Sequence, residues 1–169
     1  MAASPLATVP ARRIMDFRIL GLDPAPFIPL YGLDDEALAR SHIRRVRIDA
    51  PHEAPDRIEL RDAEPGESVL LLNHVYMDLP TPYFGTHAIF VREGALRRHD
   101  AVNAVPDALR RRLLSVRAFD AEGMMIDADV AEGTVLEPLV ARLLADPRTS
   151  FLHAHHARRG CYAARIERA

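Results

Sequence analysis

The segment SFLHAHHARRGCYAARIE, residues 150–167, decides the fold class of this chain. Residues 150–156 and 161–167 have the pattern of two β-strands, and the four residues between them form a short connection that ends in glycine. Two strands joined by so short a connection run antiparallel. The sequence therefore predicts that the chain closes with a β-hairpin, which belongs to a mostly antiparallel sheet.

Upstream of this hairpin, the apolar pattern predicts more strands than helices. Strands are expected at residues 17–20, 46–48, 58–60, 69–72, 88–91, 115–119 and 124–130. Helices are expected after Asp34, from Pro106 to about Leu114, and over residues 134–145. In the last of these, Thr134 and Glu137 have the spacing of a capping box, and an apolar stripe at helical spacing is formed by Leu136, Leu139, Val140, Leu143 and Leu144. These elements predict an α+β fold: a mostly antiparallel sheet with two or three helices packed on one side.

The length of 169 residues suits a single domain. We expect residues 15–169 to form one α+β domain and residues 1–14, which lack apolar periodicity, to form a flexible N-terminal tail. A strand-like run follows Met15 at once, so Met1 and Met15 are both candidate translation starts.

Composition excludes several classes of function. The formal net charge of −2 gives no overall field that would attract nucleic acid or anionic lipid. All 22 basic residues are arginines, so no lysine Schiff base or lysine general base is available. Apolar runs are too short for a membrane-spanning helix, the N-terminus does not resemble a signal peptide, and the single cysteine favours a reducing compartment. We expect a cytoplasmic protein with no nucleic-acid or membrane partner; the sequence identifies no other partner and no oligomeric state.

The C-terminal segment holds the residues that could carry chemistry. Side chains alternate along a strand, so His153 and His155 share one face and lie about 6.5–7 Å apart along it. His156 lies on the other face, opposite Cys161 if the hairpin loop has four residues, and in that register His155 faces Tyr162.

Three interpretations of this segment stay open. His153 and His155 can hold a divalent metal with a third ligand from the 74–87 region, for which His74, Asp78 and His87 are the candidates and His74 is the one we adopt. Alternatively, His156 acts as a base on the Cys161 thiol. In the third interpretation, the histidines are hydrogen-bonded structural side chains and Cys161 is a small buried apolar residue.

A second region of interest is NHVYMDLPTPYFGTH, residues 73–87. Its prolines and its density of polar and aromatic residues predict a stiff loop. Such a loop can form a pocket wall, or it can be purely structural.

Taken together, several segments resemble the uncharacterised bacterial family called domain of unknown function 1203. They are DFRILGL, RIELRDAEPGESVLLLNH, PYFGTHAIFVRE, LLSVRAFDAEGMMIDADVAEG and HAHHARRGCYAARIER, which extend over nearly all of residues 16–169. The resemblance implies no established activity, substrate or cofactor.

Two departures from the family pattern bear on mechanism. Where the pattern has Pro-Cys-Arg, this chain has Pro55-Asp56-Arg57, which argues against a mechanism that needs two cysteines. Where the pattern has asparagine, this chain has His156, so a dyad of His156 with Cys161 would be peculiar to it.

Five positions match the family pattern: Arg57, Tyr83, Arg117, His155 and Cys161. Together with His74 they form our candidate pocket, in which the two arginines are expected to clamp an anion or carboxylate. The leading hypothesis is a domain that binds a small ligand or a divalent metal near the C-terminal hairpin, with enzymatic activity left open. The alternative is a non-catalytic structural or interaction domain without such a site.

Overall fold

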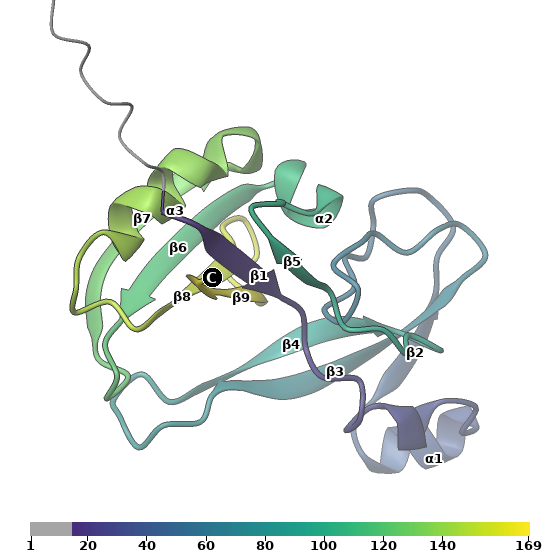
Figure 1. The fold of residues 1–169 in the computed structure, drawn as a ribbon. Helices are drawn as coiled ribbons and strands as arrows, with labels where there is room; N and C mark the ends of the chain where they lie inside the picture. Colours follow the sequence, from purple (N-terminus) through teal and green to yellow (C-terminus); the bar gives the residue numbers. More distant parts are fainter. Residues whose placement is uncertain (1–14) are drawn as a thin grey trace, which may run out of the picture.

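The computed structural model describes residues 15–169 and arranges them as two antiparallel sheets with short helices around them (Figure 1). The predicted tail, residues 1–14, lies outside the described residues. The larger sheet has the strand order β5-β1-β9-β8-β6-β7 and the smaller one the order β2-β3-β4. The predicted dominance of antiparallel strands is confirmed, and the second sheet was not foreseen.

The elements have the following bounds. The strands are β1 (Phe17–Leu20), β2 (Arg44–Arg47), β3 (Ser68–Met77), β4 (Gly85–Arg92), β5 (Asp100–Val102), β6 (Leu113–Phe119), β7 (Met125–Glu132), β8 (Phe151–His156) and β9 (Tyr162–Arg168). The helices are α1 (Asp35–Arg40), α2 (Asp107–Arg110) and α3 (Leu136–Leu144), with 3-10 turns at Ile28–Leu30 and Gly133–Val135. No helix among residues 15–169 is long and apolar enough to cross a membrane.

One face of the larger sheet forms the main hydrophobic core. Val116 on β6, Ala154 on β8 and Ile166 on β9 are completely buried there, against five buried apolar residues of α3. This is the apolar stripe that the spacing of residues 134–145 predicted. Because side chains alternate along each strand, the opposite face of β8 and β9 must meet something else.

That opposite face packs against β3 and β4 through a group we call the histidine layer: Tyr76, His87, His153, His155 and Tyr162. The Tyr76 ring lies 5.9 Å from His153, 5.1 Å from His155 and 5.8 Å from Tyr162, measured between ring centroids. His87 stacks on Tyr76 at 4.4 Å. The two sheets are therefore held together by aromatic and imidazole rings.

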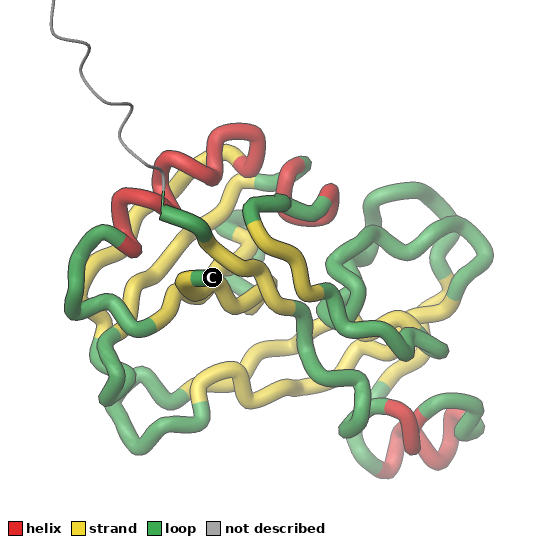
Figure 2. Tube along the Cα trace, viewed as in Figure 1, coloured by secondary structure: helices red, strands yellow, loops and turns green. Residues whose placement is uncertain are grey.

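The predicted strand at residues 58–60 is wrong. Ile58 and Leu60 are buried, as an apolar alternation requires, but they lie in the long irregular connection between β2 and β3 (Figure 2). The cause is Asp56, whose carboxylate accepts hydrogen bonds from the backbone N–H groups of Ile58 (3.2 Å) and Glu59 (2.6 Å) and curls the chain. Leu60 then has a φ of +52°, which a strand cannot accommodate.

The predicted loop at residues 73–87 is wrong as well. β3 continues to Met77 and β4 begins at Gly85, so only the turn between them is irregular. His74 and His87 are directly paired across the two strands. The burial of this segment alternates with a period of two, since His74 and Tyr76 are more buried than Asn73 and Val75. The alternation was not recognised in the sequence because polar and aromatic residues dominate the segment.

Two predicted helices are shorter than expected. The helix from Pro106 ends at Arg110, because β6 begins at Leu113 and pairs with β8. α3 starts only at Leu136, and the predicted capping box does not form: Glu137 instead forms an ion pair with Arg110. The helix predicted after Asp34 is confirmed, with the Asp34 carboxylate accepting from Ala37 N–H at 2.7 Å.

Candidate functional site

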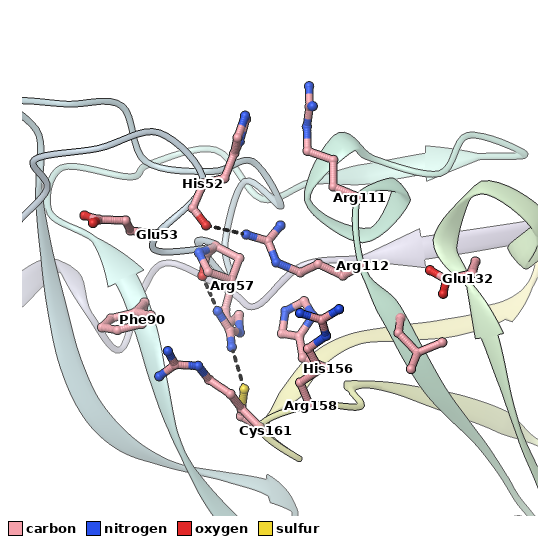
Figure 3. A pocket seen from close by; sticks show the side chains of 13 residues that line it. His52, Glu53, Arg57, Phe90, Arg111, Arg112, Glu132, His156, Arg158 and Cys161 are labelled. Carbon is pink, nitrogen blue, oxygen red and sulfur yellow. Dashed lines mark hydrogen bonds between the residues drawn. The ribbon is translucent and has the colours of Figure 1, made fainter.

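A pocket of about 420 Å³ opens where three separate segments of the chain meet. One wall is the β2–β3 connection, the second is the junction of α2 with β6, and the third is the β8–β9 hairpin (Figure 3). We call it the arginine pocket, and it is lined by His52, Glu53, Pro55, Arg57, Phe90, Arg111, Arg112, Leu113, Glu132, His156, Arg158, Arg159 and Cys161. Its size is within the range of small-molecule sites.

Arg57 forms the floor of this pocket and is only 1% exposed. Its Nε donates to the carbonyl of Tyr162 at 2.8 Å, Nη1 donates to the carbonyl of Pro55, and Nη2 donates to Cys161 Sγ at 3.2 Å. None of these acceptors is a carboxylate, and Arg57 forms no salt bridge with the described residues. Burial lowers the pKa of Arg57, as expected for a cation removed from water.

Positive charge dominates the lining of the pocket. It contains five arginines and only two acidic residues, Glu53 and Glu132, an excess of three positive charges in a chain whose formal net charge is −2. The guanidinium groups of Arg57 and Arg112 point into the space between His52 and Cys161, whereas Arg111 points away (Figure 3).

Arg112 is fixed in place by groups from the wall. Its Nη2 lies 2.7 Å from a carboxylate oxygen of Asp62 and donates to the carbonyl of His52 at 3.0 Å. The other oxygen of Asp62 lies 2.8 Å from Nδ1 of His52. One buried acid therefore orients both the arginine and the histidine.

The β8–β9 hairpin delivers His156 and Cys161 to the same pocket. His156 N–H donates to the carbonyl of Cys161 at 2.9 Å, and Gly160 has a φ of +75°, which closes the turn. His156 is 7% exposed, and burial together with Arg57 and Arg112 lowers its pKa to about 2, so its ring is neutral. Its Nδ1 has no hydrogen-bond partner within residues 15–169. The predicted register, in which His156 faces Cys161 and His155 faces Tyr162, is confirmed.

The histidine layer has a different character. His153 and His155 are 3% and 0% exposed, and burial, with the charge of Arg117 contributing, lowers the pKa of each to about 3. His155 Nδ1 donates to the carbonyl of Gly160 at 3.2 Å, which leaves its Nε2 as a buried lone pair without a partner among the described residues. His87 Nδ1 accepts from Tyr162 N–H at 3.1 Å. These rings are neutral and mutually packed.

In the part of the chain that the structure describes, no group of three or more His, Cys, Asp or Glu side chains is arranged to hold a metal ion. His153 and His155 do share a face, with ring centroids 6.2 Å apart, and His74 lies beside Phe27 and Tyr162. The metal set of His153, His155 and His74 stays a prediction.

The six residues of the predicted pocket do not come together. Only Arg57 and Cys161 line the arginine pocket. His155 belongs to the histidine layer, and Arg117 lies next to it in register with His153. The other two lie elsewhere: His74 lines a separate cleft beside Phe27, and Tyr83 packs on Phe119 at 5.9 Å near the β3–β4 turn.

At position 56, where the family pattern has cysteine, Asp56 bonds to backbone groups. The Asp56 carboxylate is completely buried and accepts from three backbone N–H groups, including that of Arg92 on β4 at 2.8 Å. Burial raises the pKa of Asp56. Its role in this chain is to attach the wall of the pocket to the smaller sheet.

The sequence-based hypothesis missed four other arginines of the site and one histidine. They are Arg111 and Arg112, Arg158 and Arg159 of the hairpin turn, and His52. The side chains of the run Arg110 to Arg112 diverge, since Arg110 bonds Glu137 whereas Arg112 enters the pocket. The position of Arg158 and Arg159 in the hairpin turn, separated from Cys161 by Gly160 alone, was the available signal.

The described residues form a mostly antiparallel β-structure with short helices, a cationic cavity of small-molecule size and one thiol. The chain belongs to the family described as protein of unknown function (DUF1203), whose model matches residues 53–168. The match extends over nearly the whole arginine pocket, and it confirms the resemblance inferred from the sequence. Neither a search of curated proteins nor a search of solved structures found a match.

Proposed function

We propose that this protein binds a small anionic ligand, one that carries phosphate or carboxylate groups, in the arginine pocket. The observation that carries the proposal is the buried guanidinium of Arg57, whose three hydrogen-bond partners are two carbonyls and a thiol. Removing a cation from water costs several kcal/mol; the charge of Asp56 offsets part of this cost without forming a salt bridge, and a bound anion would offset more of it.

Three partly buried arginines that lie outside the pocket support this interpretation by contrast. Arg45 lies 2.9 Å from Glu93, Arg61 lies 2.7 Å from Glu67, and Arg92 lies 2.9 Å from Glu59. Each of these has an acidic partner, and Arg57, which is more buried than any of them, has none among the described residues. A guanidinium also presents paired N–H groups that match carboxylate and phosphate oxygens.

The pocket favours anions over cations and metals. Arg57, Arg112 and the hairpin arginines add positive potential to the cavity. In a partly enclosed cavity such a potential raises the local concentration of anions.

Isothermal titration calorimetry with pyrophosphate and with citrate tests the proposal. We expect one saturable site, and in the Arg158→Gln/Arg159→Gln double variant an affinity about tenfold lower. The matched control is the removal of an arginine outside the pocket: Arg142, which is exposed and bonded to Asp127 and Asp129, can be replaced with glutamine without change in binding. No saturable heat at millimolar anion, or equal affinity in all three proteins, would contradict the proposal.

We also infer that residues 15–169 act as one domain in the cytoplasm, with α2 and α3 covering the outer face of the larger sheet. Support comes from Leu109 of α2, which shares the main core with α3, and from the presence of a single cysteine. Limited proteolysis that released two stable fragments would overturn the single-domain part, and accumulation outside the cytoplasm would overturn the location.

A further inference from the structure

Cys161 is the single cysteine of the chain, and its side chain lies in the lining of the arginine pocket, partly exposed. Its Sγ accepts a hydrogen bond from Arg57 Nη2 at 3.2 Å (Figure 3). The thiolate is the nucleophilic form of cysteine, and an adjacent cation stabilises it. Since Arg57 has no acidic partner among the described residues, no carboxylate competes with the sulfur for this guanidinium.

The arrangement around the sulfur is rigid. Arg57 is held by the carbonyls of Tyr162 and Pro55, and Tyr162 is itself anchored in the histidine layer. Cys161 sits immediately before β9, where the hydrogen bond from His156 N–H to its carbonyl fixes the backbone. The guanidinium and the sulfur are therefore positioned by the fold and need no rearrangement to meet.

A second group points to a ligand at the same place. The His156 imidazole lines the pocket, is more than nine-tenths buried, and has an Nδ1 without a hydrogen-bond partner in residues 15–169. Buried polar atoms are nearly always paired, so an unpaired one in a pocket wall indicates a missing hydrogen-bond partner. A polar group of a ligand, or a water held by that ligand, would satisfy it in either tautomer of the ring.

We propose that Cys161 undergoes thiol–disulfide exchange with small disulfides that carry carboxylate groups. The inference rests on the proposed function, because the arginines of the pocket would bind those carboxylates. The Cys161 thiolate attacks one sulfur of the disulfide, a new S–S bond forms to that sulfur, and the other half leaves as a thiolate that takes the electron pair of the broken bond. The cysteine sulfur is oxidised and the leaving sulfur is reduced, so no other oxidant is needed.

Because the chain has no second cysteine, the product is a mixed disulfide that persists until a second small thiol attacks it. The pocket is then occupied covalently by the anionic group that it would otherwise bind reversibly. Cys161 would thus be a modification site that reports the oxidation state of small acidic thiols.

The test compares two disulfide reagents on the full-length protein. Dithiobis-nitrobenzoate carries two carboxylates and dithiodipyridine carries none, and both release a coloured product. Relative to a free model thiol, we expect the protein to prefer the carboxylate reagent about tenfold, with a preference that declines as salt is added. In the Arg158→Gln/Arg159→Gln variant the ratio of the two rates should fall severalfold, and in Arg142→Gln it should stay the same.

Two results would overturn the inference. One is a rate ratio no different from that of the model thiol; the other is a folded protein that reacts with neither reagent. Calorimetry of the unmodified chain with pyrophosphate separates this inference from the proposed function, because pyrophosphate contains no disulfide and binds without exchange. Retained anion binding without exchange leaves the proposed function standing and removes the inference; loss of anion binding in the unmodified chain removes both.

Discussion

The two faces of the β8–β9 hairpin place similar residues in opposite surroundings. On one face, His153 and His155 are enclosed between two sheets, neutral, and in contact with the rings of Tyr76 and Tyr162. On the other, His156 lines an open pocket with five arginines. A shift of one residue along a strand moves a side chain from one face to the other. The histidine layer therefore serves the fold, and the arginine pocket is the place for a ligand.

Removing a ring from the histidine layer should have the largest effect on stability. Tyr162 is 4% exposed and packs against Tyr76, His153 and His155. We predict that Tyr162→Ala lowers the free energy of unfolding by about 3–5 kcal/mol, because a large buried ring is deleted. Urea denaturation measures this loss.

The matched change on the other face is Arg158→Ala. Arg158 is exposed at the pocket rim, and its substitution should alter the free energy of unfolding by no more than about 0.5 kcal/mol. A loss below about 1 kcal/mol for Tyr162→Ala would mean that the histidine layer is not a core.

Lowering the pH should decrease the free energy of unfolding, because the histidine layer contains buried neutral histidines. The pKa values of His153 and His155 in the folded protein, about 3, lie below the ordinary 6.5, so between these values the unfolded chain binds more protons. The contribution that these two neutral histidines make to the free energy of unfolding is fully present above pH 6.5. It declines as the pH falls toward 3, by about 1.4 kcal/mol per histidine per pH unit. His156, with a pKa of about 2, adds to the same trend.

Urea midpoints measured at several pH values between neutral and mildly acidic would show this slope. In a His155→Gln variant, the free energy of unfolding should change less steeply with pH, because one of the titrating histidines has been removed. If stability did not change as pH fell through 6.5, the histidines would not be buried in their neutral form.

Raising the salt concentration should affect the two faces differently, with a smaller effect than those of Tyr162→Ala and of acid. Anion binding in the arginine pocket depends on exposed charges such as Arg158 and Arg159, so raising ionic strength should weaken it about two- to fivefold. The histidine layer contains no charged member, so thermal unfolding without ligand should shift little. Calorimetric titrations at low and high sodium chloride check this, and a binding affinity independent of salt would argue against a charge-based site.

Strand alternation within the C-terminal hairpin was enough to predict which histidines lie on which face of the hairpin. It separated His153 and His155 from His156 and placed His156 opposite Cys161, because both follow from a period of two and a four-residue loop. The apolar stripe of α3 was equally visible from its spacing. Local patterns determine local geometry.

Contacts between distant segments could not be predicted in the same way. Arg57 reaches Cys161 from more than a hundred residues upstream, and Arg112 enters the same pocket from the end of α2. A buried carboxylate, Asp56, turned the expected strand at residues 58–60 into a curled loop. His74 and His87 lie in paired strands, and their polar character suggested a loop instead.

We expect an anion to bind in the arginine pocket and not in the histidine layer. Nuclear magnetic resonance of uniformly labelled protein, titrated with pyrophosphate, tests it most directly. We predict saturable shifts in the Arg57 side-chain Nε–H and in the backbone amides of Arg158, Arg159 and Cys161, with the imidazole signals of His153 and His155 unchanged. Shifts confined to the histidine layer or to the cleft beside His74, or no shifts at millimolar pyrophosphate, would contradict the account.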